Sequence, residues 1–245
     1  MTSCKTNNDL IKNMGCSIEE KFYSKKNKVY KAKCNEGSLL EKDFVVVKRY
    51  LQSYSNIKKE VDLLKYLKQK GLSVPEIYFQ KNEYLLMEYI EGKTLLDIME
   101  EREQSNPLEM GGIYQSNDKL IGQLIEWMKK FYYYTDNKII MKDINLRNFI
   151  VSNEGIIYGF DFEDYTEGDV KEDIGKLCAY MLTYSPPFTS WKLKFTQEVF
   201  NRFANEFGVN HNILLDEVEK QINRINSNRG QAFSTEKFKK LIIGQ

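Results

Sequence analysis

The chain has 245 residues, of which 42% are apolar and 13% aromatic, and its formal net charge at pH 7 is +1. This length and composition predict a globular protein with a packed core, arranged as one large domain or two small lobes. The small net charge argues against wrapping of nucleic acid, although basic residues dominate the first sixty positions and eight acids stand between Glu154 and Asp173 beside the single base Lys171.

The cysteine and histidine patterns argue against several kinds of metal site and catalytic site. The cysteines form no C-x-x-C pair and have no companion histidines, so we expect neither a zinc site nor a disulfide framework, and a reducing cytoplasm is the simplest location. They are Cys4, Cys16, Cys34 and Cys178. His211 is the single histidine, and we interpret it as a solvated residue at a helix start, which argues against Ser-His-Asp or Cys-His catalysis. The polar N-terminus predicts no signal peptide, and apolar runs far below the roughly 20 residues that span a bilayer predict no membrane association.

The first part of the chain has the pattern of a small β-rich lobe. Strands rich in β-branched and aromatic residues are expected within residues 19–24, 29–34 and 43–50. A helix is expected over residues 55–72, with Ser55 as N-cap and Gly71 as its end. Residues 76–80 and 84–90 predict a β-hairpin, followed by a linker at residues 90–93.

From residue 94 onward the apolar spacing is helical. The expected helices cover residues 95–102, 117–134, 169–182, 191–207, 212–225 and 234–243. The polar, glycine-bearing stretch 102–116 is expected to be a loop. The chain is therefore predicted to consist of a lobe at residues 1–90 and a larger helical lobe at residues 91–245.

Polar residues interrupt apolar runs between residues 141 and 164, where folding alone does not need them. Asp143 and Asn148 are separated by four residues, and a short hairpin over residues 149–158 returns the chain to Asp161. Two carboxyls and an amide brought together suit one or two hard divalent cations and a hydroxyl to be deprotonated. Taken singly, Asp143 and Asn148 are also interpreted as turn formers.

The order of these parts resembles the protein-kinase-like superfamily, and within it the aminoglycoside and choline phosphotransferase branch. The phrases KGLSVPEI, YLLMEYIEGKTL and GFDFEDYTEGDVKEDIGKL are similar to that branch, and with the D-x-x-x-x-N loop they cover roughly residues 25–180. The resemblance implies an α+β bilobal fold, with a small antiparallel β-sheet lobe with one helix and a larger, mostly helical lobe.

The resemblance also implies roles for individual residues. Lys48 in VVVKRY would hold the nucleotide phosphates, and Glu60 would pair with it. Asp143 would be the catalytic base, and Asn148 and Asp161 would bind Mg²⁺. Singly, Lys48 is equally a solubilising lysine and Glu60 a solvated helix residue; their occurrence in order with the others favours a nucleotide site.

Residues after the second hairpin strand would contact the base of the nucleotide. The resemblance implies that backbone groups of Glu88 and Ile90 bind adenine and that the Met87 side chain closes the back of the pocket. Asp173 resembles the residue that braces the catalytic loop.

Three positions depart from the pattern of the branch. The loop expected to cover the phosphates lacks glycine and contains Lys25, Lys26 and Lys28, which either supply charge or form a solvated turn. Met141 replaces a histidine that organises the loop, so we expect altered rigidity and retained chemistry. Glu163 follows the metal-binding strand and either assists the metal or is solvated.

Together these features predict transfer of the γ-phosphate of ATP or GTP, with Mg²⁺, to a hydroxyl of a small molecule such as an amino sugar or amino alcohol. The short stretch between Asp161 and Val170 leaves little room for a peptide platform. An acidic strip would attract a cationic acceptor, although a solvated rim explains it equally; its members are Glu163, Asp164, Glu167 and Asp169. The alternatives are a nucleotide-binding pseudokinase scaffold and a compact protein Ser/Thr kinase.

Overall fold

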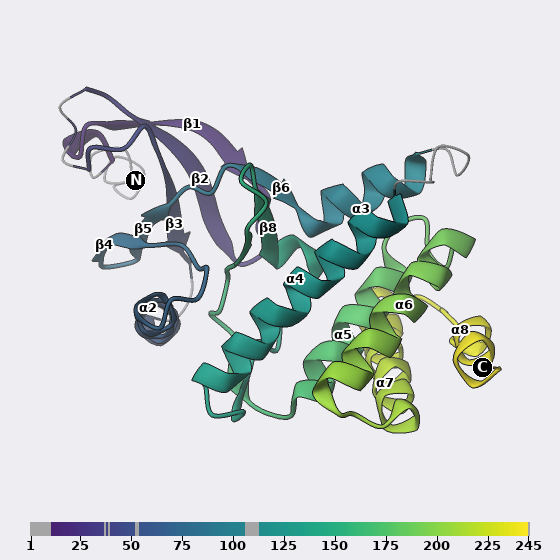
Figure 1. Ribbon diagram of the computed structural model, residues 1–245. Coiled ribbons are helices and arrows are strands. Elements are labelled where there is room, and N and C mark those ends of the chain that lie inside the picture. Colours follow the sequence, from purple (N-terminus) through teal and green to yellow (C-terminus); the bar gives the residue numbers. More distant parts are fainter. Residues whose placement is uncertain (1–10, 37, 39, 52–53, 106–112, 245) are drawn as a thin grey trace. The chain divides into compact units, whose positions relative to one another are not determined.

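The computed structural model describes residues 11–36, 38, 40–51, 54–105 and 113–244 (Figure 1). The chain divides into two compact units. The first unit comprises residues 1–91 and 160–163, and the second comprises residues 92–159 and 164–245. A β-sheet dominates the first unit and helices dominate the second, which confirms the predicted fold class.

The first unit is built on a five-stranded antiparallel sheet in the order β1-β2-β3-β5-β4. Its strands are β1 (Cys16–Phe22), β2 (Asn27–Cys34), β3 (Phe44–Tyr50), β4 (Ile77–Lys81) and β5 (Tyr84–Glu88). Helix α2 (Tyr54–Gln69) begins at Tyr54, so Ser55, the expected N-cap, lies inside its first turn. Gly71 follows this helix with a φ of +83°, which glycine adopts without steric penalty.

The two faces of this sheet follow from the alternation of side chains along β3. Val45 and Val47 point to one face, where they pack in a cluster with Ala32 and Leu86. Tyr50 belongs to the cluster on the other face, together with apolar residues of α2 such as Ile57. Lys48 lies two residues before Tyr50 on β3, so its side chain points to the same face of the sheet. That face packs on α2.

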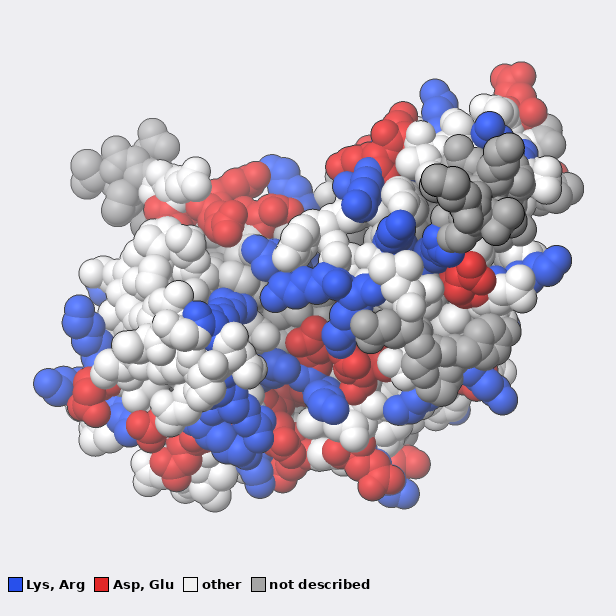
Figure 2. All heavy atoms as spheres, turned by 180° about the vertical axis from the view of Figure 1, so that it is seen from behind, with Lys and Arg blue, Asp and Glu red and all other residues white. Residues whose placement is uncertain are grey.

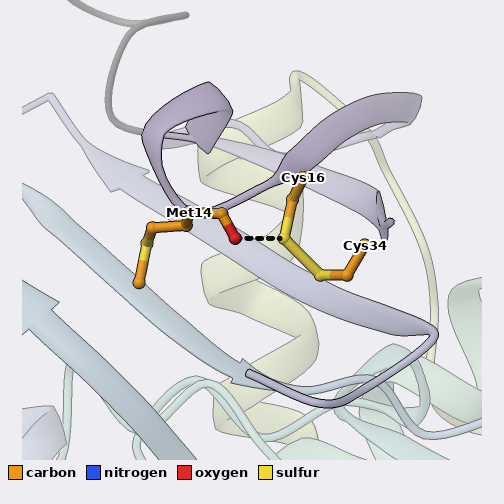
Figure 3. The surroundings of a disulfide bond; sticks show 3 residues. All are labelled: Met14, Cys16 and Cys34. Atoms are coloured by element: carbon orange, nitrogen blue, oxygen red, sulfur yellow. Dashed lines mark hydrogen bonds between the residues drawn. A yellow bond between two sulfur atoms is a disulfide. The ribbon is translucent and has the colours of Figure 1, made fainter. Parts of the chain in front are cut away.

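Cys16 and Cys34 form a disulfide bond (Figure 3), and the expectation of no disulfide was wrong. The two residues are paired across β1 and β2, with Cα atoms 4.0 Å apart. The Cys16 sulfur also lies 3.7 Å from the backbone carbonyl of Met14. Cys178 is buried and free. The cysteines therefore give no support to a reducing compartment.

Among the described residues, no helix is long and apolar enough to cross a membrane.

The second unit contains short strands as well as helices. The strands are β6 (Gly92–Thr94), β7 (Ile139–Ile140), β8 (Phe149–Ser152), β9 (Ile157–Gly159) and β10 (Thr166–Glu167). The expected linker at residues 90–93 was partly wrong, because β6 pairs with β8 in the sheet β6-β8-β9. A Cβ atom at Gly92 would collide with the backbone carbonyl of Val151, so this pairing requires glycine.

The predicted helices are all present among the described residues. They are α3 (Leu95–Gln104), α4 (Ile113–Tyr134), α5 (Val170–Thr183), α6 (Ser190–Phe207), α7 (His211–Arg229) and α8 (Glu236–Ile243). Thr94 and Asp169 form capping boxes at the starts of α3 and α5. His211 is exposed at the start of α7, as predicted. Residues 106–112 of the loop expected at residues 102–116 lie outside the described residues. The ends of that stretch were wrongly predicted, because residues 102–104 belong to α3 and residues 113–116 to α4.

Candidate active site

A buried lysine joins the sheet to the helix in the first unit. Lys48 lies on the central strand β3, and helical spacing places Glu60 on the α2 face that contains Ile57 and Val61. Lys48 Nζ donates to Glu60 Oε2 over 2.8 Å, and both side chains are buried. Tyr50 donates its hydroxyl hydrogen bond to the same carboxylate oxygen. The structure thus brings together the lysine and glutamate singled out in the sequence.

Two further carboxylates converge on the same ammonium group. Lys48 Nζ lies 2.6 Å from Asp161 Oδ1 and 3.4 Å from Glu163 Oε2. Oxygens of Glu60, Asp161 and Glu163 all lie within 4.8 Å of one another. Burial opposes the charge of Lys48, yet Glu60 and then Asp161 hold its pKa well above the ordinary value. One fixed positive charge therefore faces three carboxylates.

Glu163 connects this group to the first residue of β2. The side-chain amide of Asn27 donates to Glu163 Oε2 over 2.6 Å, and both residues are buried. Asn27 is paired with Tyr50 in the register of β2 and β3, which places it on the Lys48 face of the sheet. Lys26 approaches the other oxygen of Glu163 at 3.9 Å. The interpretation of Glu163 as solvated was therefore wrong.

The residues expected to contact adenine lie at the end of β5. Met87 is buried in the cluster that contains Tyr50 and Ile57. The Glu88 N–H donates to the carbonyl of Glu76, and its carboxylate accepts from Lys68, so its N–H is already used. Ile90 follows the strand, and its backbone has no backbone hydrogen bond to the described residues. We therefore regard Ile90 as the residue of this group with a free backbone donor.

Asp143 and Asn148 lie together in the second unit. The Asn148 side-chain amide donates to the backbone carbonyl of Asp143 over 2.9 Å, and the 3-10 helix η2 (Leu146–Asn148) fixes its position. The Asp143 carboxyl is 46% exposed, with Lys176 Nζ 3.5 Å away. Lys176 on α5 was missed in the sequence, because only the fold brings it to a residue 33 positions earlier.

Asp173 is buried beneath this loop and binds its backbone. Its carboxylate accepts hydrogen bonds from the backbone N–H groups of Met141 and Lys142 at 2.7 and 3.1 Å, and from the Tyr132 hydroxyl at 2.7 Å. Burial raises the pKa of Asp173 to about 6, although these hydrogen bonds oppose the shift. The Met141 side chain is buried, and its backbone N–H donates to Asp173. The altered rigidity expected of the loop stays a prediction.

Oxygen donors suited to Mg²⁺ are present in each unit. Asn148 Oδ1 accepts no hydrogen bond from the described residues, while its Nδ2 is used. The Asp161 carboxylate is 38% exposed, and its backbone has a φ of +64°, a strained conformation that often marks functional positions. Carboxylate and amide oxygens of this kind are the ligands that a hard divalent cation prefers, and each unit offers them by itself.

The members of the acidic strip predicted to attract a cationic acceptor have different surroundings. Glu163 is buried beside Lys48, and Asp169 caps α5 and pairs with Lys171. Glu167 is exposed on β10. Acidic and basic residues are interspersed over the face of the molecule in Figure 2. Of the strip, Glu163 alone is buried, and the attraction of a cationic acceptor stays a prediction.

Comparisons with known proteins agree with this geometry. Residues 11–176 match the model of the RIO domain, which covers more than half of the chain. A protein of Dictyostelium discoideum named "Probable serine/threonine-protein kinase" is 31% identical over 114 residues, which are 45% of this chain and 21% of that protein. The chain thus spans about a fifth of the length of that relative. These matches do not extend to the aminoglycoside and choline phosphotransferase branch.

Proposed function

Because the chain belongs to the RIO domain family, an atypical protein-kinase-like family, we propose that it transfers the γ-phosphate of ATP to a hydroxyl group in a Mg²⁺-dependent reaction. The observation that carries this proposal is the contact of Lys48 with both Glu60 and Asp161. In protein kinases a lysine of the third strand paired with a helix glutamate positions the nucleotide phosphates, and the carboxylate of the metal strand holds Mg²⁺ beside it.

Each residue then has a defined task. Asp143 accepts or orients the proton of the acceptor hydroxyl, and Asp173 holds the loop backbone in place for it. Asn148 Oδ1 and the Asp161 carboxylate would hold Mg²⁺, which would neutralise charge on the phosphates. Lys48 binds the phosphate tail, so catalysis consists mainly of positioning and charge compensation.

A catalytically silent scaffold is the alternative that the glycine-free turn suggested. The hydrogen bond from Asn27 to Glu163 argues against a silent scaffold. It fixes the start of β2 through a side chain, so the loop before β2 does not depend on glycine for its position. Retention of an exposed carboxylate at Asp143 also favours an active enzyme, because a scaffold needs no base.

We favour a serine or threonine hydroxyl of a protein as the acceptor. Support comes from the Dictyostelium discoideum relative, whose name describes a serine/threonine-protein kinase. A small hydroxyl-bearing molecule such as an amino sugar or amino alcohol is the second candidate. The observation in its favour is that α5 begins at Val170, nine residues after Asp161, which leaves a short segment for docking a peptide.

The test is ATP consumption with Mg²⁺ in the presence of serine and threonine peptides, amino sugars or amino alcohols, with GTP in parallel. Asp143→Asn should abolish phosphoryl transfer and leave ATP binding nearly intact, because the change removes the proton acceptor and keeps the size of the side chain. Asp216→Asn, at an exposed carboxylate of α7, is the matched control. Undiminished transfer by Asp143→Asn, or no ATP binding by the unmodified protein, would refute the proposal.

A further inference from the structure

Helix α5 presents a row of side chains beside the proposed base. Lys176 and Tyr180 are spaced by four residues, so they lie along one face of the helix, and Tyr184, the C-cap residue, follows four residues later. Lys176 Nζ lies 3.5 Å from Asp143 Oδ1 and also donates to the backbone carbonyl of Lys142. The rings of Tyr180 and Tyr184 are stacked with centroids 6.0 Å apart. The row therefore begins beside Asp143 and continues toward the C-terminal end of α5.

Two arginines lie over these rings. The Arg147 guanidinium is 5.4 Å from the centroid of Tyr184, and the Arg229 guanidinium is 5.7 Å from the centroid of Tyr180. Arg147 comes from η2, within the loop that contains Asp143, and Arg229 from the last turn of α7. We call Arg147, Lys176, Tyr180, Tyr184 and Arg229 the basic-aromatic patch. Three segments far apart in the sequence build it within one unit.

The two arginines of the patch have no carboxylate partner among the described residues. Among the described residues, neither Arg147 nor Arg229 has a carboxylate within 4.0 Å, and both side chains are exposed. Lys176 has Asp143 as its carboxylate partner, and that residue is needed for the acceptor hydroxyl. Stacking on an aromatic ring fixes a guanidinium while its N–H donors stay available. Two such groups next to a base are suited to bind an anion.

A structural role explains this arrangement less well. A basic residue in the last turn of a helix is favourable to the helix dipole, which accounts for the presence of Arg229. The dipole does not require that Arg229 stack on Tyr180, nor that Arg147 from another segment stack on the neighbouring ring.

We propose that the basic-aromatic patch binds acidic side chains of a peptide whose serine or threonine hydroxyl is presented to Asp143. This inference rests on the proposed function and adds the substrate class. Alternate side chains of an extended peptide lie about 6.8 Å apart on one side, so two acidic side chains of one peptide can face the patch together. Arginine binds carboxylates in a two-pronged manner that lysine does not reproduce. The preferred acceptor therefore has acidic residues at alternate positions beside its hydroxyl.

The experiment measures binding of a fluorescent peptide by anisotropy, without nucleotide, so that a failure of catalysis does not affect it. One peptide has a single serine and glutamates at alternate positions, and the other has glutamines in their place. The acidic peptide should bind about tenfold more tightly, and Arg147→Ala combined with Arg229→Ala should remove this preference. Arg224→Ala, an exposed arginine of α7 outside the patch, is the matched control and should retain it.

Reversing the charge of both arginines distinguishes a loss of peptide recognition from a loss of folding. Arg147→Glu combined with Arg229→Glu should convert the preference to a peptide with lysines in place of the glutamates, whereas loss of folding would abolish all binding. Arg147→Lys should retain part of the preference, and thermal unfolding checks that each variant is folded. Equal binding of acidic and neutral peptides, or an unchanged preference in a folded double alanine variant, would overturn the inference. Tighter patch-dependent binding of an RNA oligonucleotide than of the acidic peptide would also overturn it.

Discussion

Replacing Lys48 by methionine tests the charge balance of the first unit. The ammonium group is the cation nearest to three carboxylates, at 2.8, 2.6 and 3.4 Å. Their oxygens lie within 4.8 Å of one another. Two unit charges at that distance repel by about 3.5 kcal/mol at an effective dielectric constant of about 20. This repulsion acts in full between Glu60 and Glu163, because both are buried. Solvent screens the repulsion between either of them and Asp161, which is 38% exposed.

Lys48→Met should therefore lower the local free energy of unfolding by about 3 to 5 kcal/mol, the usual cost of breaking a buried ion pair. Glu60→Gln removes one of three negative charges and leaves Lys48 with two carboxylates, so its cost should stay below about 2 kcal/mol. The asymmetry between the two variants is the specific prediction, because a simple one-to-one ion pair would make both changes similarly costly.

Native-state hydrogen exchange of the β3 and α2 amides, without nucleotide, measures this difference. Protection should fall by about 150- to 5,000-fold in Lys48→Met and by less than about 30-fold in Glu60→Gln. Lys58→Met, at an exposed lysine of the same helix, is the control and should leave protection unchanged. A loss in Lys48→Met no larger than that in Glu60→Gln would refute the reasoning.

Three further changes test other contacts. Asp161→Ala should remove the Mg²⁺-dependent part of the thermal stabilisation by ATP, and a stabilisation that still depends on Mg²⁺ would contradict its assignment as a ligand. Asp173 has a pKa of about 6 in the folded protein against an ordinary 3.8, so the folded state binds more protons and its stability falls as pH rises from about 4 to about 6. The stability of the native protein relative to Asp173→Asn should thus decrease by up to about 3 kcal/mol over this range in urea unfolding, and a difference independent of pH would exclude the raised pKa. Gly159→Ala should destabilise by about 1 to 3 kcal/mol, because its Cβ would overlap the Trp127 ring, while Gly122→Ala within α4 should not; equal melting temperatures of the two variants would contradict the clash.

The sequence predicted the elements well because most of them have a periodic apolar face. The hairpin after Asn148 and helix α2 follow from alternation and helical spacing with few competing interpretations. Strand β6 was missed, because three residues show no period and pair with a partner about sixty positions later. The pair Cys16 and Cys34 was missed for a related reason, since their bond depends on the register of two strands.

The candidate site was predictable where residue types follow a fixed order along the chain. Lys48, Glu60 and Asp161 were found in this way, and the structure brings them together. Asn27 and Glu163 form a contact across 136 positions that no local pattern indicates. Arg147 and Arg229 are similar cases, because a solvated arginine and one stacked on a tyrosine look alike in a sequence.

The order in which the chain is synthesised has a bearing on how the first unit becomes stable. Residues 160–163 belong to that unit, although they follow the rest of it by about 70 residues. At about 5 to 20 residues per second, Lys48 and Glu60 leave the ribosome roughly 5 to 23 s before Asp161 and Glu163. During this interval the nascent sheet lacks two of the contacts of its buried lysine. A fragment that ends at residue 91 has the same deficit permanently, because its buried Lys48 lacks the carboxylates of Asp161 and Glu163.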